Sequence, residues 1–418
     1  MTPPQVDGLF SSTRMAHLTI HAPTRSVEAT IALPTSKSVA NRALLCAALA
    51  GDLSVVRDRP DADDTRILHD LLSAREPILR CGLGGTTLRF ALAWAAVQEG
   101  REHFVTAGKE LLARPHQPLV MALCTLGARI ETTMSGFMVH GLRLKGGEVE
   151  FDRPLSSQYI SALMLVAPTM EKSLSIHWKG GLLSRPYVDM TAQVLRHFGA
   201  EVTMGQDGLT VGPGDLKPRP IAIPPDRSAA AFWYQIVALA CKAHVVLPGM
   251  VGDGWQGDAR MTGIMAPLVE TIATADGIEL VPTRKQDTPP GTIDLRDAPD
   301  LFPALACTFA GRGIPVTFTG LDNLHLKESD RVQVMADQLQ AWGASVAADG
   351  STFHVKGGRV APVKEVVLDP HGDHRMAMAL APLALMSGVV RIDHPEVVAK
   401  SYPAYWRHLE AAGFRIER

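Results

Sequence analysis

The chain has 418 residues, more than one ordinary domain contains, which predicts two or three domains. Its composition is 46% hydrophobic and 20% charged, which is typical of a globular protein and excludes a disordered or fibrous chain. The formal net charge of -2 lacks the basic excess of a nucleic-acid-binding protein. Any anion-binding site must therefore come from a local arrangement of residues.

The five cysteines are dispersed and form no C-x-x-C pair. This pattern argues against a disulfide framework or a structural zinc site and favours a reducing compartment. The N-terminal segment lacks the apolar core of a signal peptide. The apolar runs at 229–241 and 376–390 are shorter than the roughly 20 residues of a membrane span, and we expect both to be buried helices. We therefore expect a cytoplasmic protein with no membrane or nucleic-acid partner.

One pattern recurs at intervals of about 70 residues: an amphipathic helix, a glycine and a short β-prone segment. A degraded copy surrounds Ala74. A unit of this length suits a βαβαββ module, although helix, glycine and strand follow one another in many α/β proteins. Six modules predict an α/β (α+β) protein with two domains of three modules each and a ligand cleft between them. The glycines, each expected as a left-handed residue at a helix C-terminus, are Gly127, Gly199, Gly277, Gly343 and Gly413.

In chain order, the first unusual helix start is PTSKSVANRALL, where Thr35 or Ser36 would cap the helix. A helix N-terminus offers free N–H groups and a partial positive charge, which suit a phosphate or carboxylate. Basic residues in a first turn oppose the helix dipole, and this cost favours a binding role over an ordinary surface helix. The polar residues of this start are Lys37, Ser38 and Arg42.

Further helix starts carry hydroxyl and basic residues. Gly85 in CGLGGTTLRF permits close backbone approach, a weak signal that is also typical of a plain turn. Arg114 precedes a proline-marked start, and Lys400 lies just ahead of Ser401, the expected cap of the last helix. Taken singly, the remaining residues are typical of ordinary helix caps. They are Ser156, Ser157, Gln158, Ser184 and Tyr187.

Charged residues gather at two starts in the last third of the chain. Lys327 and Arg331 are four residues apart and would share a helix face, with Glu328 between them. A surface ladder of salt bridges is the alternative. Asp300 enters an apolar helix after a strand-like segment. It would act either as a base whose pKa is raised by apolar neighbours or as the N-cap of that helix.

Arg375 lies at the mouth of a strongly apolar helix in the segment DPHGDHRMAMAL. His371, Asp373 and His374 stand beside it and would also suit a metal ion. Without a distant third ligand, however, the spacing H-x-x-H is weak support for a metal site.

These motifs form a recognisable set. From about residue 17 to 415 they are PTSKSVANRALL, GGTTLRF, ARPHQPLV, SSQYISAL, SRPYVDM, APDLFPALA, LKESDR, GDHRMAM and KSYPAYW. The set resembles the enolpyruvyl transferase family, and within it the branch that acts on shikimate 3-phosphate. The resemblance implies two domains of three βαβαββ units each, with the active site in the cleft between them. One domain would contain 1–33 and 227–418, and the other 34–226.

The resemblance implies that the protein moves the enolpyruvyl group of phosphoenolpyruvate to the 5-hydroxyl of shikimate 3-phosphate and releases phosphate. This step of the shikimate pathway, which leads to the aromatic amino acids, passes through a tetrahedral addition product and needs no cofactor or metal. We expect a monomer with these two substrates as its partners. The implied catalytic residues are Asp300 as proton acceptor, with Glu328 and Lys37 for proton transfer at the methylene carbon.

The resemblance also implies which residues bind each substrate. Those for shikimate 3-phosphate are Lys37, Ser38, Arg42, Ser156, Ser157, Gln158, Ser184, Tyr187, Asp300, Asn323 and Lys327. Those for phosphoenolpyruvate are Lys37, Gly85, Arg114, Gln158, Arg331, Arg375 and Lys400.

Two alternative functions stay open. The sister enzyme that acts on UDP-N-acetylglucosamine typically has Lys-Asn where this chain has Lys37-Ser38, and a reactive cysteine near the position of Arg114. Cys124 lies close by, and we expect it to pack in the core. A catalytically silent binding protein on the same scaffold is opposed by the intact Asp300 and the other catalytic residues.

The chain departs from the family pattern at several positions. Thr35 replaces a usual glycine, and Leu83 and Gly372 stand where asparagine is frequent. The first repeat is also short. Gly85 is retained, which implies sensitivity to glyphosate, a compound that resembles phosphoenolpyruvate in this family.

Overall fold

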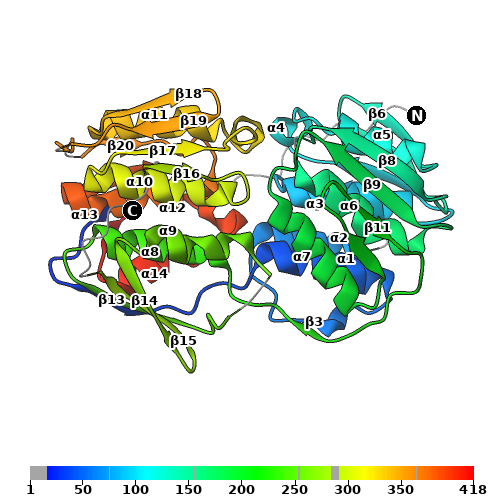
Figure 1. The fold of residues 1–418 in the computed structure, drawn as a ribbon, viewed down its shortest axis with the longest axis horizontal. Coiled ribbons are helices and arrows are strands. Elements are labelled where there is room, and N and C mark those ends of the chain that lie inside the picture. The colour runs from blue at the N-terminus through cyan, green and yellow to red at the C-terminus, as the bar shows by residue number, and fades with distance from the viewer. Residues whose placement is uncertain are drawn as a thin grey trace.

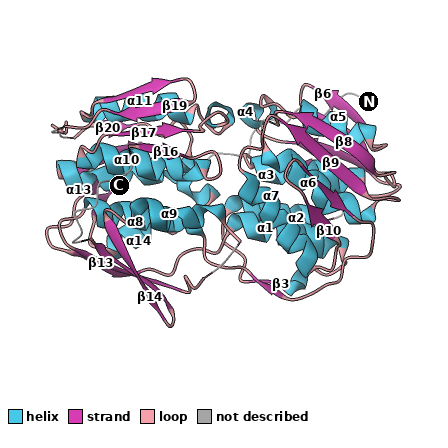
Figure 2. Cartoon of the chain, viewed as in Figure 1, coloured by secondary structure: helices cyan, strands magenta, loops and turns pink. Residues whose placement is uncertain are grey.

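A computed structural model describes residues 17–74, 76–154, 156–252, 255–283, 291–358, 360–363 and 365–418. Two lobes lie side by side in Figure 1, one coloured mainly blue to green and the other mainly green to red, and the C-terminus lies in the second. In each lobe the helices are gathered inside and the strands lie around them (Figure 2). Within the described ranges, no helix is both long enough and apolar enough to span a bilayer.

Four sheets repeat one strand arrangement, in which a parallel pair is extended by two antiparallel strands. The first is β4(Ile78–Arg80), β5(Glu102–Thr106), β7(Gly136–His140) and β6(Arg129–Thr133). The second is β8(Gly147–Asp152), β9(Leu174–Lys179), β11(Gly208–Val211) and β10(Val202–Met204). The third is β2(Val27–Thr30), β13(Ala243–Pro248), β15(Gly277–Pro282) and β14(Val269–Thr274). The fourth is β16(Thr292–Asp294), β17(Val316–Thr319), β19(Thr352–Val355) and β18(Val346–Asp349).

The two remaining sheets join distant parts of the chain. The sheet β20(Val367–Leu368), β21(Val389–Asp393), β1(His17–His21) and β22(Arg415–Glu417) has the same arrangement, and strands from both ends complete it. The parallel pair β3(Val56–Arg57) and β12(Ile221–Ala222) is the only two-stranded sheet in the described ranges. Five sheets of one design and this smaller pair confirm the predicted fold class.

The helices pack their apolar faces against the interior of each lobe. Residues 228–239 of α8 are buried, as their nearly continuous apolar sequence predicts, and Asp226 caps the helix through the N–H of Ser228 at 2.9 Å. The helices are α1(Lys37–Leu49), α2(Asp63–Ser73), α3(Gly85–Ala96), α4(Lys109–Leu112), α5(Gln117–Thr125), α6(Ser157–Val166), α7(Arg185–His197), α8(Arg227–Leu239), α9(Met261–Met265), α10(Phe302–Arg312), α11(Arg331–Trp342), α12(His374–Leu380), α13(Ala384–Ser387) and α14(Tyr405–Ala411). The 3-10 helices are η1(Leu53–Val55), η2(Ala167–Thr169), η3(Gly257–Arg260), η4(Pro299–Leu301), η5(Leu324–Leu326), η6(Ala381–Leu383) and η7(Pro395–Lys400).

The buried apolar residues form two separate cores. One draws on residues between 39 and 223. The other joins residues 18–33 to residues between 229 and 414. The chain crosses between the lobes twice, and the crossings run beside each other. Ser36 N–H donates to Pro224 O at 2.7 Å, and Asp226 N–H donates to Pro34 O at 2.8 Å.

The structure corrects one copy of the sequence repeat. Gly127, Gly199, Gly343 and Gly413 follow helices with positive φ, as predicted. The expected helix before Gly277 is wrong, because residues 269–274 form β14 of a hairpin. The segment VETIAT is rich in β-branched residues and leads to Asp-Gly, a strong hairpin signal. Gly277 thus corresponds to Gly136, since a Cβ at either glycine would strike a carbonyl oxygen of the neighbouring strand.

Candidate active site

One cavity between the lobes is lined by helix starts from both. It collects every site residue that the sequence predicted except Lys400, which lies beside it and donates a hydrogen bond to the cavity residue Glu328. The predicted residues on its wall are Lys37, Ser38, Arg42, Gly85, Arg114, Ser156, Ser157, Gln158, Ser184, Tyr187, Asp300, Asn323, Lys327, Glu328, Arg331 and Arg375.

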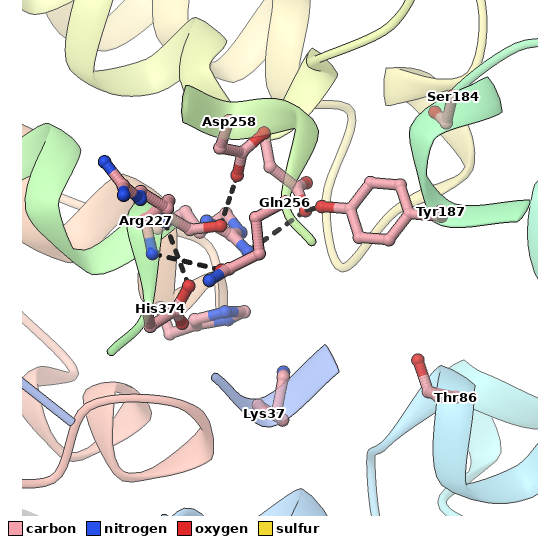
Figure 3. Close-up of polar contacts among 12 residues, drawn as sticks. Lys37, Thr86, Ser184, Tyr187, Arg227, Gln256, Asp258 and His374 are labelled. Carbon is pink, nitrogen blue, oxygen red and sulfur yellow. Dashed lines mark hydrogen bonds and ion pairs between the residues drawn. The ribbon is translucent and has the colours of Figure 1, made fainter. Parts of the chain in front are cut away.

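The start of α1 presents two cations. Ser36 caps the helix through the N–H of Val39, as predicted. Lys37 Nζ donates to Asp64 Oδ2 at 2.8 Å, and this side chain points into the space between the lobes (Figure 3). The buried guanidinium of Arg42 donates to Thr191 Oγ1 at 2.7 Å. Its burial lowers its pKa to about 10, so it is still a cation at neutral pH.

The start of α3 is a tight cradle. Arg89 Nη1 donates to Gln158 Oε1 at 2.5 Å, and Gln158 Nε2 donates to Thr86 Oγ1 at 2.9 Å. A Cβ on Gly85 would lie 2.9 Å from Arg89 Nη1 and 3.6 Å from Arg114 Nη1. The cradle therefore has room for an anion between two guanidinium groups only because residue 85 has no side chain.

Hydroxyl groups line the wall between α6 and α7. Ser156 caps α6 through the N–H of Gln158, as expected. Ser184 precedes α7 in the left-handed region, with φ of 59°, and makes no capping hydrogen bond. Its hydroxyl accepts instead from Asn323 Nδ2 at 3.4 Å, across the cleft. A strained non-glycine residue of this kind is typical of a functional site.

The far wall holds a carboxylate between two arginines. Asp300 Oδ1 accepts from Arg331 Nη1 at 2.8 Å, and Asp300 Oδ2 lies 3.0 Å from Arg375 Nη2. Tyr187 OH donates to the same Oδ2 at 2.8 Å from the other lobe. Burial alone would raise the pKa of Asp300, but the charges of Arg375, Lys327 and Arg331 outweigh it and hold the pKa well below its ordinary value. The raised pKa that its apolar neighbours predicted is therefore wrong.

A second carboxylate, Glu328, shares Arg331 with Asp300. Glu328 accepts from Arg331 Nη2 at 3.0 Å and from Lys400 Nζ. Burial would raise its pKa, but Lys400 and Arg331 together hold the pKa well below its ordinary value. Arg331 also contacts Asp373 Oδ2 at 2.6 Å, so this arginine, 1% exposed, serves three carboxylates. A surface ladder of salt bridges is thus excluded for Arg331.

Several local expectations are wrong. Helix α11 begins at Arg331, so Lys327 and Glu328 precede it rather than share its face. Asp300 lies within η4, and its side chain binds arginines instead of capping a helix. Ser401 ends η7 and caps no helix, since α14 begins at Tyr405.

Burial and geometry also place Cys124 and Asp373, two side chains that the sequence analysis considered. Cys124 is exposed rather than packed in the core, because it faces outward on α5, and it does not line the cavity. Within the described residues, no group of three or more histidine, cysteine or acidic side chains is arranged to hold a metal ion. Asp373, considered as a metal ligand, instead caps α12 and pairs with Arg331.

The cavity wall also contains residues that the sequence analysis did not select as site residues. They are Asp64, Thr86, Arg89, Pro115, Tyr159, Leu326 and His374. Arg89 and Thr86 stand in the quoted GGTTLRF segment, so an arginine inside an apolar helix was an available signal. Asp64 gives no such signal, because its partner Lys37 is distant in the sequence. His374 is 2% exposed, and burial, with Lys37 next in effect, holds its pKa well below its ordinary value.

The arrangement separates into two anion-binding groups with two carboxylates beside them. Hydroxyl groups from α6 and α7 lie near Arg42 and Lys327, and arginines with Lys400 surround Gly85 and Glu328. Two anionic molecules could therefore bind side by side. Asp300 and Glu328 would face the atoms between them, where a proton acceptor and a stabiliser of positive charge act.

The chain matches the EPSP synthase (3-phosphoshikimate 1-carboxyvinyltransferase) family over residues 21–75 and 69–409. It is 36% identical over 400 residues to the 3-phosphoshikimate 1-carboxyvinyltransferase of Bacteroides fragilis, which covers 94% of this chain and 97% of that protein. It is 32% identical over 420 residues to the enzyme of that name from Methanoculleus marisnigri, with 93% and 98% covered.

Solved structures show the same fold. EPSP synthase from Acinetobacter baumannii matches with a TM-score of 0.76 and 22% identity, covering 96% of this chain and all (100%) of that one. The enolpyruvyl transferase NikO from Streptomyces tendae matches with a TM-score of 0.72 and 18% identity, covering 96% and 98%. With the fold, the cavity and these sequence matches taken together, the chain belongs to the EPSP synthase family.

Proposed function

We propose that this protein is a 3-phosphoshikimate 1-carboxyvinyltransferase, which transfers the enolpyruvyl group of phosphoenolpyruvate to the 5-hydroxyl of shikimate 3-phosphate and releases phosphate. The family match over most of the chain supports this activity. The observation that carries the assignment to this cavity is that Asp300 and Glu328 lie in one cleft with two distinct anion-binding groups. The sequence matches favour this activity over both alternative functions.

The proposal includes the organisation of the chain. The two domains are 1–33 with 227–418, and 34–226; residues 1–16 lie outside the described ranges. The two separate cores support this division. We propose further that the protein acts as a monomer in the cytoplasm, with its two small-molecule substrates as partners.

In this proposal, shikimate 3-phosphate binds to the hydroxyl-bearing group of residues, which comes mainly from domain 34–226. The hydroxyls of Ser156, Ser157 and Ser184 suit its phosphate, because Lys37 and Lys327 supply positive charge nearby. The 5-hydroxyl lies against Asp300, whose carboxylate stays ionised and can accept the proton as the new C–O bond forms.

Phosphoenolpyruvate binds to the arginine-rich group around Gly85 and Glu328. Arg114, Arg331 and Arg375 come from both sides of the cleft, so an anion held by all three pulls the lobes together. At an effective dielectric of 20, a charge pair at 4 Å is worth about 4 kcal/mol, against about 1 in water. Excluding water from the cleft therefore strengthens each of these contacts.

Glu328 changes role when phosphoenolpyruvate binds. In the free protein, Lys400 and Arg331 keep its pKa low, and it is a carboxylate. The anionic substrate shares those cations, which weakens their effect on Glu328 and raises its pKa. Glu328, with Lys37, can then deliver a proton to the methylene carbon and stabilise the resulting oxocarbenium character.

Phosphate release tests the proposal. Purified protein should release phosphate from phosphoenolpyruvate only when shikimate 3-phosphate is present. Release driven by UDP-N-acetylglucosamine would assign the sister activity, and tight binding of both substrates with no release would assign a silent binding protein.

A further inference from the structure

Tyr159 is a buried residue of the cavity wall that the proposed mechanism does not use. It lies in the first turn of α6, directly after Gln158, and only 1% of its surface is exposed. Its hydroxyl donates a hydrogen bond to Pro115 O, in the turn that precedes α5. Its ring faces Arg89, whose guanidinium carbon lies 5.2 Å from the ring centre. This one side chain therefore contacts two segments that each carry an arginine of the cavity.

The hydroxyl contact joins α6 to the turn that carries Arg114. Within that turn, Arg114 N–H donates to Leu111 O at 3.2 Å, and His116 Nε2 lies 2.7 Å from the same oxygen. Burial lowers the pKa of His116 to about 4, so its ring is neutral at neutral pH and donates through Nε2 to this carbonyl. These contacts close the turn on itself. The Tyr159 hydroxyl then fixes the turn to α6 at Pro115, the residue after Arg114.

The ring contact holds a second arginine, whose own hydrogen bonds are incomplete. Arg89 is 6% exposed and donates from Nη1 to Gln158 Oε1 at 2.5 Å and to Gly85 O at 3.3 Å. Its Nε is buried and has no hydrogen-bond partner among the described residues. A guanidinium over the face of an aromatic ring is attracted by the ring electrons, more strongly where water is excluded. The ring of Tyr159 therefore stabilises Arg89 in this orientation.

Both arginines reach the same place, the start of α3 at Gly85. A Cβ on Gly85 would lie 2.9 Å from Arg89 Nη1 and 3.6 Å from Arg114 Nη1. An anion that two guanidinium groups hold depends on both distances, because charge-assisted hydrogen bonds need a separation of about 2.7–2.9 Å. A displacement of either guanidinium would therefore weaken one of the two contacts.

We propose that Tyr159 is a positioning residue of the phosphoenolpyruvate site, whose hydroxyl holds Arg114 and whose ring holds Arg89 at the spacing that the anion needs. The inference rests on the proposed function, because it assumes that phosphoenolpyruvate binds at Gly85. The hydroxyl groups proposed for shikimate 3-phosphate take no part in either contact. Tyr159 should therefore affect the binding of one substrate and not of the other.

Two substitutions separate the two contacts. Tyr159→Phe keeps the ring over Arg89 and removes the donor to Pro115, so the KM for phosphoenolpyruvate should rise roughly 3- to 10-fold, as for the loss of one hydrogen bond. Tyr159→Leu also removes the ring, and the KM should rise roughly 10- to 50-fold. In both variants kcat should change less than about twofold, because the arginines hold the substrate in the ground state and in the transition state alike. The Kd of shikimate 3-phosphate should also change less than about twofold.

A double-mutant cycle tests whether the hydroxyl acts through Arg114. In the Arg114→Ala background, Tyr159→Phe should lower kcat/KM for phosphoenolpyruvate less than about twofold, because the side chain that it positions is absent. Tyr234→Phe is a matched control outside the cavity. Tyr234 is 2% exposed, and its hydroxyl lies 3.0 Å from Thr262 Oγ1 and 2.9 Å from Thr271 Oγ1. This control should leave the constants for both substrates unchanged.

The outcomes are distinct. The inference is overturned by an unchanged KM in Tyr159→Phe, by an equal loss of affinity for shikimate 3-phosphate, or by an effect of full size in the Arg114→Ala background. If Tyr159→Leu does not fold, the Phe variant and the cycle decide. If the native protein releases no phosphate with both substrates present, the proposed function fails, and the inference fails with it.

Discussion

Gly85→Ala is a small change that should weaken the binding of phosphoenolpyruvate and leave the binding of shikimate 3-phosphate almost unchanged. The added methyl group would lie 2.9 Å from Arg89 Nη1, 3.6 Å from Arg114 Nη1 and 3.8 Å from Gln158 Oε1. Arg89 cannot retreat freely, because it donates to Gln158 Oε1 at 2.5 Å and its guanidinium lies 5.2 Å from the ring centre of Tyr159. The methyl group therefore occupies space that phosphoenolpyruvate needs.

The size of the effect follows from the contact that is lost. Displacing Arg89 by a few tenths of an ångström weakens one charge-assisted hydrogen bond, worth about 1.5–3 kcal/mol. That free energy corresponds to a rise of roughly 10- to 100-fold in the KM for phosphoenolpyruvate. The hydroxyls around the shikimate phosphate are untouched, so the Kd of shikimate 3-phosphate should change by less than about threefold.

Steady-state kinetics and a binding titration measure the two quantities. Gly263→Ala is a matched control, since nothing lies within 4 Å of a Cβ at that position in α9. An unchanged KM for phosphoenolpyruvate would refute the cradle at Gly85. An equal loss of affinity for shikimate 3-phosphate would show that residue 85 affects the binding of both substrates.

Four further outcomes are expected. Asp300→Ala and Glu328→Ala should each lower kcat by about 10²- to 10⁴-fold and shift the midpoint of thermal unfolding only slightly. A large loss of stability in parallel with the loss of turnover would indicate that the two residues have a structural role. Because the folded pKa values of both carboxyls are depressed, their stabilisation is present above their ordinary pKa and is lost as pH falls, so the native protein should lose more stability than Glu328→Gln between neutral and acid pH in denaturant titrations. Asp258, buried on η3, has a shift of the opposite sign, because burial raises its pKa to about 7. Its contribution to stability is lost as pH rises through about 7, so Asp258→Asn should exceed the native stability at pH 8, by at most about 4 kcal/mol in denaturant titrations. Glyphosate should compete with phosphoenolpyruvate at Gly85, and a normal rate in millimolar inhibitor would contradict this.

Local sequence signals predicted some helix starts correctly, although Ser184 and Ser401 cap no helix. Ser36, Ser156 and Asp373 accept hydrogen bonds from backbone N–H groups in the first turns that follow them. Capping depends on three or four adjacent residues, so it is visible in the sequence. The hairpin at Gly277 was missed although its Asp-Gly turn was equally local, because the even spacing of glycines favoured a helix there.

Properties that depend on distant residues could not be predicted in the same way. The sequence suggested a raised pKa for Asp300 from its apolar neighbours along the chain. Its pKa is lowered because Arg331, Arg375 and Lys327, which the fold brings to it, outweigh its burial. The raised pKa of Asp258 was not predicted from the sequence either, since it comes from burial and from charges that are distant along the chain. The family resemblance supplied the residues of the cavity, and the structure supplies their charges and contacts.

Deuterium incorporation tests the central claim most directly. The proposed addition and elimination protonate the methylene carbon of phosphoenolpyruvate and then remove a proton from the resulting methyl group. With both substrates in D₂O, the enolpyruvyl group of the product should carry deuterium at that carbon, detected by mass spectrometry or NMR. The account predicts this label in the native protein and its near absence from equal incubations with Glu328→Ala. Product that forms at the native rate without deuterium would contradict it.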